Sequence, residues 1–287
     1  VYMDLLNPTV GLKLANVEAV PAINFEKMAV FLRSSCENNI ALSKEDWDSY
    51  EISWDFEQHP LVKRKELHSL EKCYLTWKTE CENRFLKMKD NEEHINVVIL
   101  KEYGLENEVS CEVPEKSISV HRIFDTKEDI PVSMDGSYYV RTKRDEIVSL
   151  ISYSVGCMFG RYSLDKKGIV NAGAPLNVNE YVSFSVDKDN IIPICDDEYF
   201  KDDIVGRFVE FIKIVYGADS LDDNLTFIAK ALGGKGSPRE IIRNYFVNDF
   251  YKEHCATYSG TVGKRPIYWL FDAGKNNSFK ALIYMHR

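Results

Sequence analysis

The sequence predicts an α+β protein that is predominantly helical. A helical-hairpin spacer is followed by a mixed helical domain with short strands and a C-terminal β-hairpin. Three observations support this fold class. Residues 67–103 place apolar side chains at helical spacing among many charges. Residues 143–159 place apolar or small side chains along one helical face. Near the end of the chain, two apolar runs flank the turn GKNN at residues 274–277.

The chain divides into three predicted regions. Residues 1–42 are too few to form a hydrophobic core of their own, and we expect them to be the tail of an upstream domain. Residues 43–110 form the spacer, and residues 111–287 form a C-terminal region that is itself incomplete at its C-terminus. Because the chain begins with Val1 rather than Met, we expect it to start inside a longer protein.

The first region contains one predicted strand and one predicted helix. Val10, Leu12 and Leu14 alternate with polar residues, which is the pattern of a short strand. Residues 25–32 (FEKMAVFL) read as a helix.

The spacer is predicted to be a connector made of two antiparallel helices. A short helix capped by Ser43 or Asp46 precedes them. The first long helix covers residues 67–88, and the second covers residues 95–103 and stops at Gly104, a natural residue just past a helix end. Helices of this kind pack as a hairpin.

Residues 143–165 form the helix around which we expect the C-terminal region to be organised. Thr142 is its predicted N-cap, with Asp145 as capping-box partner. Gly156 and Gly160 lie in a stripe of small residues. Each glycine destabilises a helix by about 1 kcal/mol relative to alanine. We therefore expect another segment to pack tightly against this stripe and offset the cost.

The elements around this helix follow from local patterns. Irregular residues 105–142 contain one strand within 117–124. Two strands, three helices and the hairpin follow, at residues 181–186, 191–194, 204–215, 221–232, 238–250, 267–271 and 279–284. Ser237, Pro238 and Glu240 predict a capping box for the third helix.

Composition excludes several classes of protein. The net charge is −9. A protein that binds nucleic acid over its whole surface is normally basic, so any DNA contact of this chain must use local basic patches. Seven cysteines without a CxxC pair indicate free thiols in a reducing cytoplasm. No apolar run is long enough for a membrane span.

No catalytic or metal motif is present in the sequence. Phosphate loops, dinucleotide-binding loops, HExxH and GxSxG are all absent. The sequence Glu253-His254-Cys255 offers metal-ligand residue types, but we interpret it as an ordinary helix end. Acidic residues 196–203 precede a helix and are expected to complement its dipole.

Local basic clusters provide the candidate DNA contacts. Phosphate contacts from Lys and Arg supply most non-specific DNA affinity. The candidates are Lys143, Arg144, Arg161, Lys166, Lys167, Arg239, Arg243, Lys264, Arg265 and Lys275.

Several segments resemble one family. ISYSVGCMFGRYSLD at residues 151–165 resembles a signature of the PglX-like adenine-specific DNA methyltransferases of BREX phage-defence systems, which are related to type IIG restriction–modification enzymes. LNPTVGLKLANVEAVPAI, INVVILKEYGL, IIPICDDEYFKDDIVGRFVEFIKIVYG, SPREIIRNYFVNDFYKEHCATY and RPIYWLFDAGKNNSFKALIYMHR are similar to further segments of that family, in order.

The resemblance implies a non-catalytic part of a larger enzyme. The family's S-adenosylmethionine loop and Asn-Pro-Pro-Tyr motif are absent here, where Asn7-Pro8 is followed by Thr9. The implied role is to hold and help recognise double-stranded DNA while an adenine is flipped into a catalytic pocket upstream. The implied cofactor of the parent enzyme is S-adenosylmethionine, with none in this part.

Two alternatives remain open from the sequence. The region could be an interaction scaffold that docks other phage-defence proteins, which the acidic net charge favours. It could also be the equivalent region of a type IIG enzyme with a nuclease elsewhere in its chain.

Overall fold

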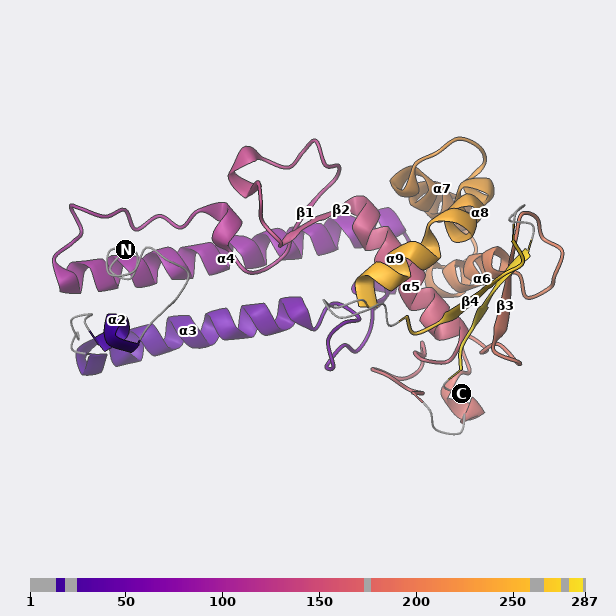
Figure 1. The fold of residues 1–287 in the computed structure, drawn as a ribbon, viewed down its shortest axis with the longest axis horizontal. Coiled ribbons are helices and arrows are strands. Elements are labelled where there is room, and N and C mark those ends of the chain that lie inside the picture. Colours follow the sequence, from indigo (N-terminus) through magenta and orange to yellow (C-terminus); the bar gives the residue numbers. More distant parts are fainter. Residues whose placement is uncertain (1–13, 19–24, 173–176, 259–265, 275–278, 286–287) are drawn as a thin grey trace.

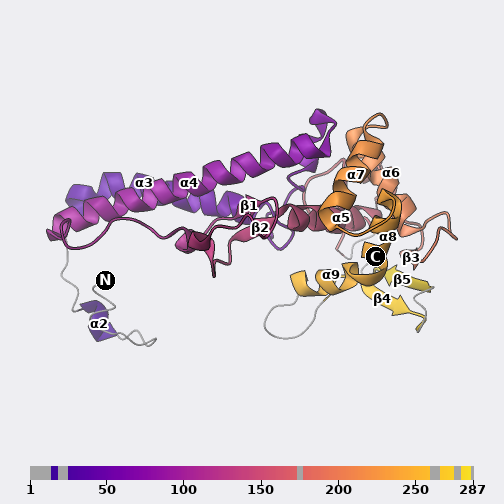
Figure 2. The ribbon, with the colours of Figure 1, turned by 90° about the horizontal axis from the view of Figure 1, so that it is seen from above.

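The first half of the chain builds a long helical arm (Figure 1). The computed structural model describes residues 14–18, 25–172, 177–258, 266–274 and 279–285. After the short α2 (Leu14–Glu18), helices α3 (Phe25–Trp47) and α4 (Leu70–Tyr103) run antiparallel and pack side by side in both views (Figures 1 and 2). With 34 residues, α4 is about 50 Å long.

Helix α4 is continuous, so the prediction of two helices within the spacer is wrong. The Ser69 hydroxyl accepts a hydrogen bond from the Lys72 amide at its start, and Gly104 closes it with φ 67°. Residues 89–94 are charged but contain no glycine or proline, and nothing there breaks the helix. The antiparallel partner of α4 is therefore α3.

Helix α3 also extends across the predicted boundary at residue 42. Ser43 and Asp46 lie inside it rather than capping a new helix. Asp46 is buried and binds Arg84 of α4 and His121 through its two carboxylate oxygens, at 3.4 and 2.6 Å. Arg84 also binds Glu45, which fixes α3 against α4.

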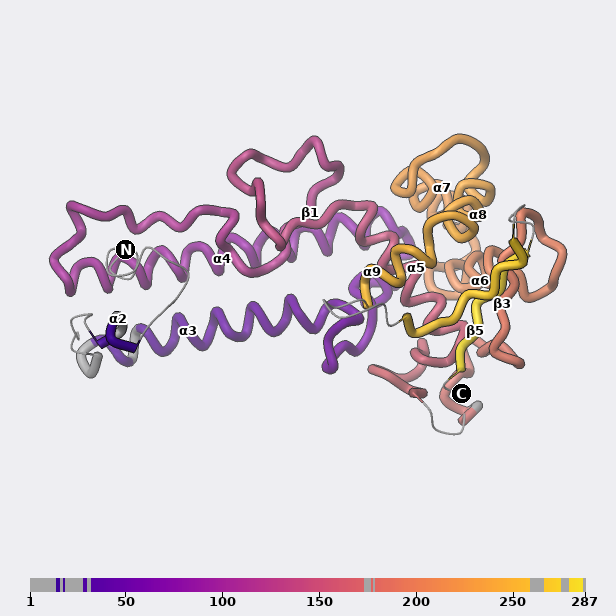
Figure 3. The backbone as a smooth tube through the Cα atoms, in the orientation of Figure 1, coloured from indigo at the N-terminus to yellow at the C-terminus, as the bar shows by residue number. Residues whose placement is uncertain are grey.

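After α4, residues 104–121 return along the arm (Figure 3). Together with Met134, they bury a small core against the middle of α4, made of Phe85, Met88, Ile118, Val120 and Met134. Strand β1 (Arg122–Phe124) then pairs in parallel with β2 (Val140–Thr142). The strand predicted within 117–124 is thus only three residues long.

Helix α5 (Lys143–Met158) lies at the centre of the globular body (Figure 1). The Thr142 hydroxyl accepts from the Asp145 amide, and the Asp145 carboxylate accepts from the Thr142 amide, so the predicted capping box is confirmed. The helix ends at Met158, earlier than the sequence suggests. Its core face packs on α6 (Ile204–Tyr216) and α7 (Leu221–Leu232).

The rest of the body combines helices with a small sheet. Helices α8 (Pro238–Asn248) and α9 (Phe250–Tyr258) follow, and the predicted capping box of Ser237 and Glu240 begins α8. The predicted hairpin is confirmed as β4 (Trp269–Asp272) and β5 (Phe279–Ile283), and β3 (Ile191–Cys195) joins it in the antiparallel order β3-β5-β4.

Other predictions have mixed outcomes. Residues 181–186 alternate in polarity but form no strand, and Leu14 begins α2 instead of ending a strand. Val10 and Leu12 lie outside the described residues. All seven cysteines are free thiols. In the described ranges, no helix has the length and apolar character that crossing a membrane requires.

Candidate nucleic-acid interface

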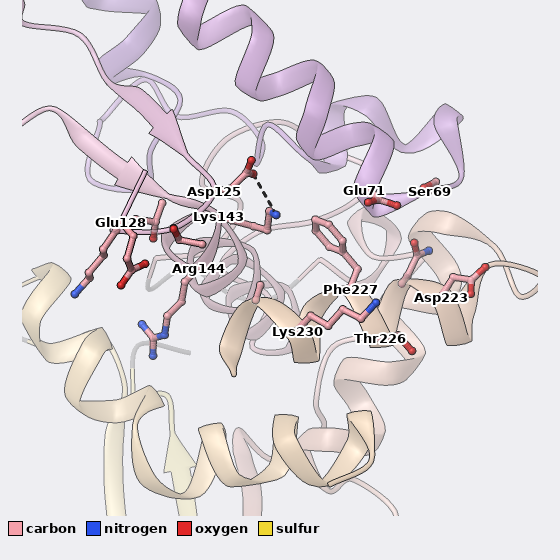
Figure 4. Close-up of a pocket in the computed structure, with 15 residues that line it drawn as sticks. Ser69, Glu71, Asp125, Glu128, Lys143, Arg144, Asp223, Thr226, Phe227 and Lys230 are labelled. Atoms are coloured by element: carbon pink, nitrogen blue, oxygen red, sulfur yellow. Dashed lines mark ion pairs between the residues drawn. The ribbon is translucent and has the colours of Figure 1, made fainter. Parts of the chain in front are cut away.

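A groove of about 760 Å³ opens at the N-terminal end of α5 (Figure 4). We call it the α5 groove. Its walls come from the start of α4 (Ser69, Glu71), from residues 125–128 after β1, and from α7, and the start of α5 forms its floor. Segments that are far apart in the sequence therefore meet where two of the predicted DNA contacts, Lys143 and Arg144, begin the helix.

Lys143 is held in place inside the groove. Its ammonium group forms an ion pair with the Asp125 carboxylate (Figure 4). The two groups are 3.1 Å apart, and the ammonium group is 5.2 Å from the Tyr74 ring centroid. Asp125 also accepts hydrogen bonds from Lys78 at 2.8 Å and Tyr74 at 2.9 Å. These contacts lower the pKa of Asp125 to about 2, and the hydrogen bond from Lys78 has the largest effect. Lys143 therefore shares a single carboxylate with Lys78, and these three groups together keep one net positive charge.

Arg144 extends from α5 in a different direction from Lys143 (Figure 4). One guanidinium nitrogen donates to Glu253 at 2.8 Å, and the Tyr245 hydroxyl donates to the other oxygen of the same carboxylate at 2.9 Å. The side chain remains 38% exposed. Because a guanidinium has five N–H donors, Arg144 keeps donors available to a ligand.

The groove carries four basic and four acidic side chains. They are Lys127, Lys143, Arg144 and Lys230, with Glu71, Asp125, Glu128 and Asp223. Lys127 and Lys230 are exposed, and no acidic group of the described ranges lies within ion-pair distance of either. These two ammonium groups, on different walls, are cations that the groove can offer to a phosphate.

A smaller depression of about 210 Å³ adjoins the α5 groove across Arg144. Lys235 from the loop before α8 and the exposed amides Asn244 and Asn248 line it. Lys235 also has no acidic partner in the part of the chain that is described. It extends the row of unpaired cations beyond the groove.

The remaining predicted contacts near α5 lie beyond its C-terminal end. Lys166 pairs with Glu180 at 2.7 Å, and Lys167 pairs with Glu57 at 2.8 Å. Both lysines are exposed, but the 16 residues of α5 put about 24 Å of helix between them and Lys143.

Arg161 also follows the end of α5 and lies among aromatic side chains. Its guanidinium is 5.5 Å from the Tyr162 ring centroid and donates to the Tyr162 hydroxyl at 3.3 Å. The charge of Arg161 also acts on the buried carboxyl of Glu51. It is half-buried and presents less of its charge to solvent than the two lysines do.

The candidates on α8 have opposite environments. Arg239 is exposed and has no ion-pair partner in the described ranges. Arg243 makes two 2.9 Å contacts with Asp203, and its side chain is only 13% exposed. Asp203 also caps α6, so this pair fastens one helix to another. Three further candidates lie outside the described residues: Lys264, Arg265 and Lys275.

Of the seven predicted contacts that lie in the described ranges, Lys143 and Arg144 line the α5 groove and the other five do not. Lys127, Lys230 and Lys235 were not singled out from the sequence, since Lys127 is surrounded by acidic residues and Lys230 looks like any helix-surface lysine. The one available signal was Lys235, which lies in the glycine-rich segment GGKGS.

The sequence Glu253-His254-Cys255 does not form a ligand cluster. Glu253 binds Arg144, and His254 Nε2 accepts from the backbone amides of Ile267 and Tyr268 at 3.0 and 3.3 Å. Groups of three or more potential metal ligands are absent from the described part of the chain.

Comparison with known proteins identifies relatives of the whole chain. No family model matches it. It is 38% identical, over 294 aligned residues, to the adenine-specific methyltransferase PglX of Lacticaseibacillus casei (strain Zhang), covering 100% of this chain and 22% of that protein. It is 33% identical to the adenine-specific methyltransferase BrxX of Escherichia coli O9:H4 (strain HS). That alignment covers 99% of this chain and 24% of BrxX. The chain spans less than a quarter of the length of either relative. Over its whole length, the chain is thus related to the PglX-like adenine-specific methyltransferases, as the sequence resemblance indicated.

Proposed function

We propose that the chain is a non-catalytic segment of an adenine-specific DNA methyltransferase, in which it positions duplex DNA for methylation. The observation that supports this function is the alignment of the entire chain with two proteins named adenine-specific methyltransferases. The parent enzyme would use S-adenosylmethionine, and its cofactor and catalytic motifs would lie outside this chain.

The α5 groove is the proposed contact surface. Lys127 and Lys230 present unpaired ammonium groups from two of its walls, Arg144 offers free guanidinium donors at its floor, and Lys235 continues the row. Contacts of this kind position a duplex through its phosphates. The carboxylates that share the groove would limit non-specific binding, because like charges repel phosphate.

A salt titration of DNA binding tests this function. The chain and a short duplex are mixed at rising salt concentration, and the binding constant is followed by fluorescence anisotropy. Each neutralised phosphate contributes a slope of about −0.9 to the plot of log K against log salt. We expect a slope of roughly −3 for contacts by the three unpaired lysines. Absence of binding even at low salt would contradict the proposal.

The arm favours a second candidate function, an interaction scaffold for other phage-defence proteins. Trp47, the last residue of α3, is 52% exposed, and Trp54 in the segment that follows is 94% exposed. Aromatic side chains are enriched in protein–protein interfaces. Pull-down with Trp54→Ser as the control variant would separate this role from DNA binding, since Trp54 does not line the α5 groove.

A further inference from the structure

The small sheet carries apolar side chains on both of its faces. Strands β3, β5 and β4 form one side of the globular body, away from the arm (Figure 1). Side chains alternate between the two faces along each strand. Ile192, Ile194 and Leu282 lie on the inner face and are buried in the main core. Trp269 and Phe271 lie on the outer face, where they are 62% and 51% exposed.

Ring contacts join this outer face to the segment that follows β3. The ring centroids of Phe271 and Phe279 are 6.1 Å apart, and those of Phe279 and Phe200 are 6.0 Å apart. Phe279 is partly exposed, and Phe200 is 44% exposed. We call Trp269, Phe271, Phe279 and Phe200 the aromatic face. Single exposed apolar residues are common on protein surfaces, but neighbouring ones from several segments mark an interaction site.

Acidic residues border the aromatic face. Residues 196–198 follow β3, whose end pairs with Phe279, and they directly precede Tyr199 and Phe200. All three acidic side chains are exposed, and in the described ranges no basic group lies within ion-pair distance of them. Tyr199 is 67% exposed. We call these three residues the acidic segment: Asp196, Asp197 and Glu198.

Contacts within the described structure do not neutralise the acidic segment. The side-chain cap of α6 comes from Asp203, which accepts from the Val205 amide at 3.0 Å. Arg243 pairs with Asp203, and from the acidic segment it reaches only the backbone carbonyl of Asp197. Residues 196–203 contain five acidic residues and one lysine. Negative charge is therefore left beside the aromatic face.

The combination of rings and carboxylates selects the partner. Nucleic acid is repelled, because its phosphates carry the same sign of charge as the acidic segment. A second copy of the chain, with a net charge of −9, is disfavoured for the same reason. A surface with apolar side chains flanked by Lys or Arg fits both features, since opposite charges across an interface favour the correct partner.

The parent polypeptide is the nearest source of such a surface. The chain spans less than a quarter of the length of PglX and BrxX. In a parent of that size, most of the polypeptide is tethered to the aromatic face. Tethering raises the effective concentration of the partner, so a few rings and charges are sufficient to hold two parts of one protein together.

We infer that the aromatic face docks against another part of the parent methyltransferase, and that this part presents apolar side chains to the rings and Lys or Arg to the acidic segment. The inference rests on the proposed function in one respect, that the chain is a segment of a longer methyltransferase. It does not depend on the proposed DNA contacts, because no residue of the aromatic face lines the α5 groove.

Hydroxyl-radical footprinting with mass spectrometry tests this contact, with a reporter peptide that calibrates the radical dose. It measures the oxidation rates of Trp269 and Phe271 in the isolated chain, whose folding is confirmed by circular dichroism, and in the full-length parent enzyme. We expect both residues to be oxidised at least about fivefold more slowly in the parent, because the core of an interface is buried. Equal rates in the two proteins would overturn the inference.

Two matched variants of the parent test the charge of the partner. Asp196→Lys with Asp197→Lys reverses the acidic segment and should return the oxidation rates of the two rings towards those of the isolated chain. Glu106→Lys with Glu108→Lys makes the same change in net charge at the far end of the arm, where both glutamates are exposed, and should leave the rates unchanged. Equal responses of both variants, or protection that develops only at high protein concentration, would contradict a basic partner within the parent.

Methylation of duplex DNA by the same parent preparation separates this inference from the proposed function. Methylation together with unprotected rings would refute the contact at the aromatic face and leave the proposed function standing. Protected rings in a parent that methylates no DNA would support the contact and contradict the proposed function.

Discussion

The ring of Tyr162 packs so closely on the backbone of Gly156 that a Cβ atom at Gly156 would lie 2.4 Å from Tyr162 Cδ2 and 2.8 Å from Cε2. Tyr162 is fully buried, and its ring stacks on that of Tyr153, which belongs to α5 like Gly156. The two ring centroids are 5.1 Å apart. The ring cannot move aside without disturbing this stack. The small-residue stripe of α5 therefore provides room for a returning side chain.

Replacing Gly156 is expected to destabilise the fold. Gly156→Ala gains helix propensity but forces Tyr162 to move, and Gly156→Leu should cost about 3 kcal/mol or more through overpacking. Urea unfolding measures the change. Gly206→Ala in α6 is the control, because its added Cβ would meet only the Glu198 carboxylate, at 3.6 Å. An equal loss in both glycine-to-alanine variants would contradict the packing argument.

The Arg243–Asp203 pair is expected to stabilise the body without contacting DNA. Arg243→Ala leaves a buried carboxylate without its cation, which typically costs about 3–5 kcal/mol. Arg243→Lys should recover little of this loss, because an ammonium group lacks the planar pair of N–H donors that Arg243 places on the two Asp203 oxygens. Thermal unfolding of the two variants provides the measurement. A variant with unchanged stability and weaker DNA binding would instead make Arg243 a DNA contact.

Acid should destabilise the protein through two buried histidines. Burial, followed by nearby positive charges, lowers the pKa of His59 to about 3 and that of His254 to about 4. The unfolded chain binds a proton at each near pH 6.5, so between pH 6.5 and 4 it holds more protons than the folded chain. The contribution of the neutral rings is complete above pH 6.5 and decreases as the pH falls.

Urea unfolding at pH 7, 6 and 5 measures this loss, which is at most about 1.4 kcal/mol per pH unit for each histidine. His254→Gln is a useful comparison, because the amide oxygen can still accept from the Ile267 and Tyr268 amides but does not titrate in this range. Its stability should depend less steeply on pH than that of the wild-type chain. An unfolding free energy that is constant from pH 7 to 5 would rule out this assignment.

Local sequence signals predicted much of the fold. Both capping boxes, Thr142 with Asp145 and Ser237 with Glu240, depend on residues three apart and were recognisable without tertiary information. The β4–β5 hairpin was equally local. The alternating residues 181–186 form no strand because alternation specifies a possible strand but no neighbour with which it could pair.

The site was less predictable because partners distant in sequence decide whether a basic residue is available. Arg243 resembled a surface arginine until the fold brought Asp203, 40 positions earlier, beside it. Lys143 is paired with Asp125 from the segment after β1, which Lys78 also contacts. The lysines that do remain unpaired, Lys127 and Lys230, are ordinary in their local sequence. Only the fold brings them to the walls of one groove.

The most direct test of the proposed DNA contact compares two pairs of lysines. Lys127→Ala with Lys230→Ala removes unpaired cations from the α5 groove, whereas Lys166→Ala with Lys167→Ala removes two exposed cations beyond the other end of α5. Duplex binding is measured against salt for both variants. The groove variant should bind DNA more weakly, with a salt slope smaller by about two units. The second variant should bind like the wild type. Equal effects of both pairs, or an unchanged slope in the groove variant, would contradict the account.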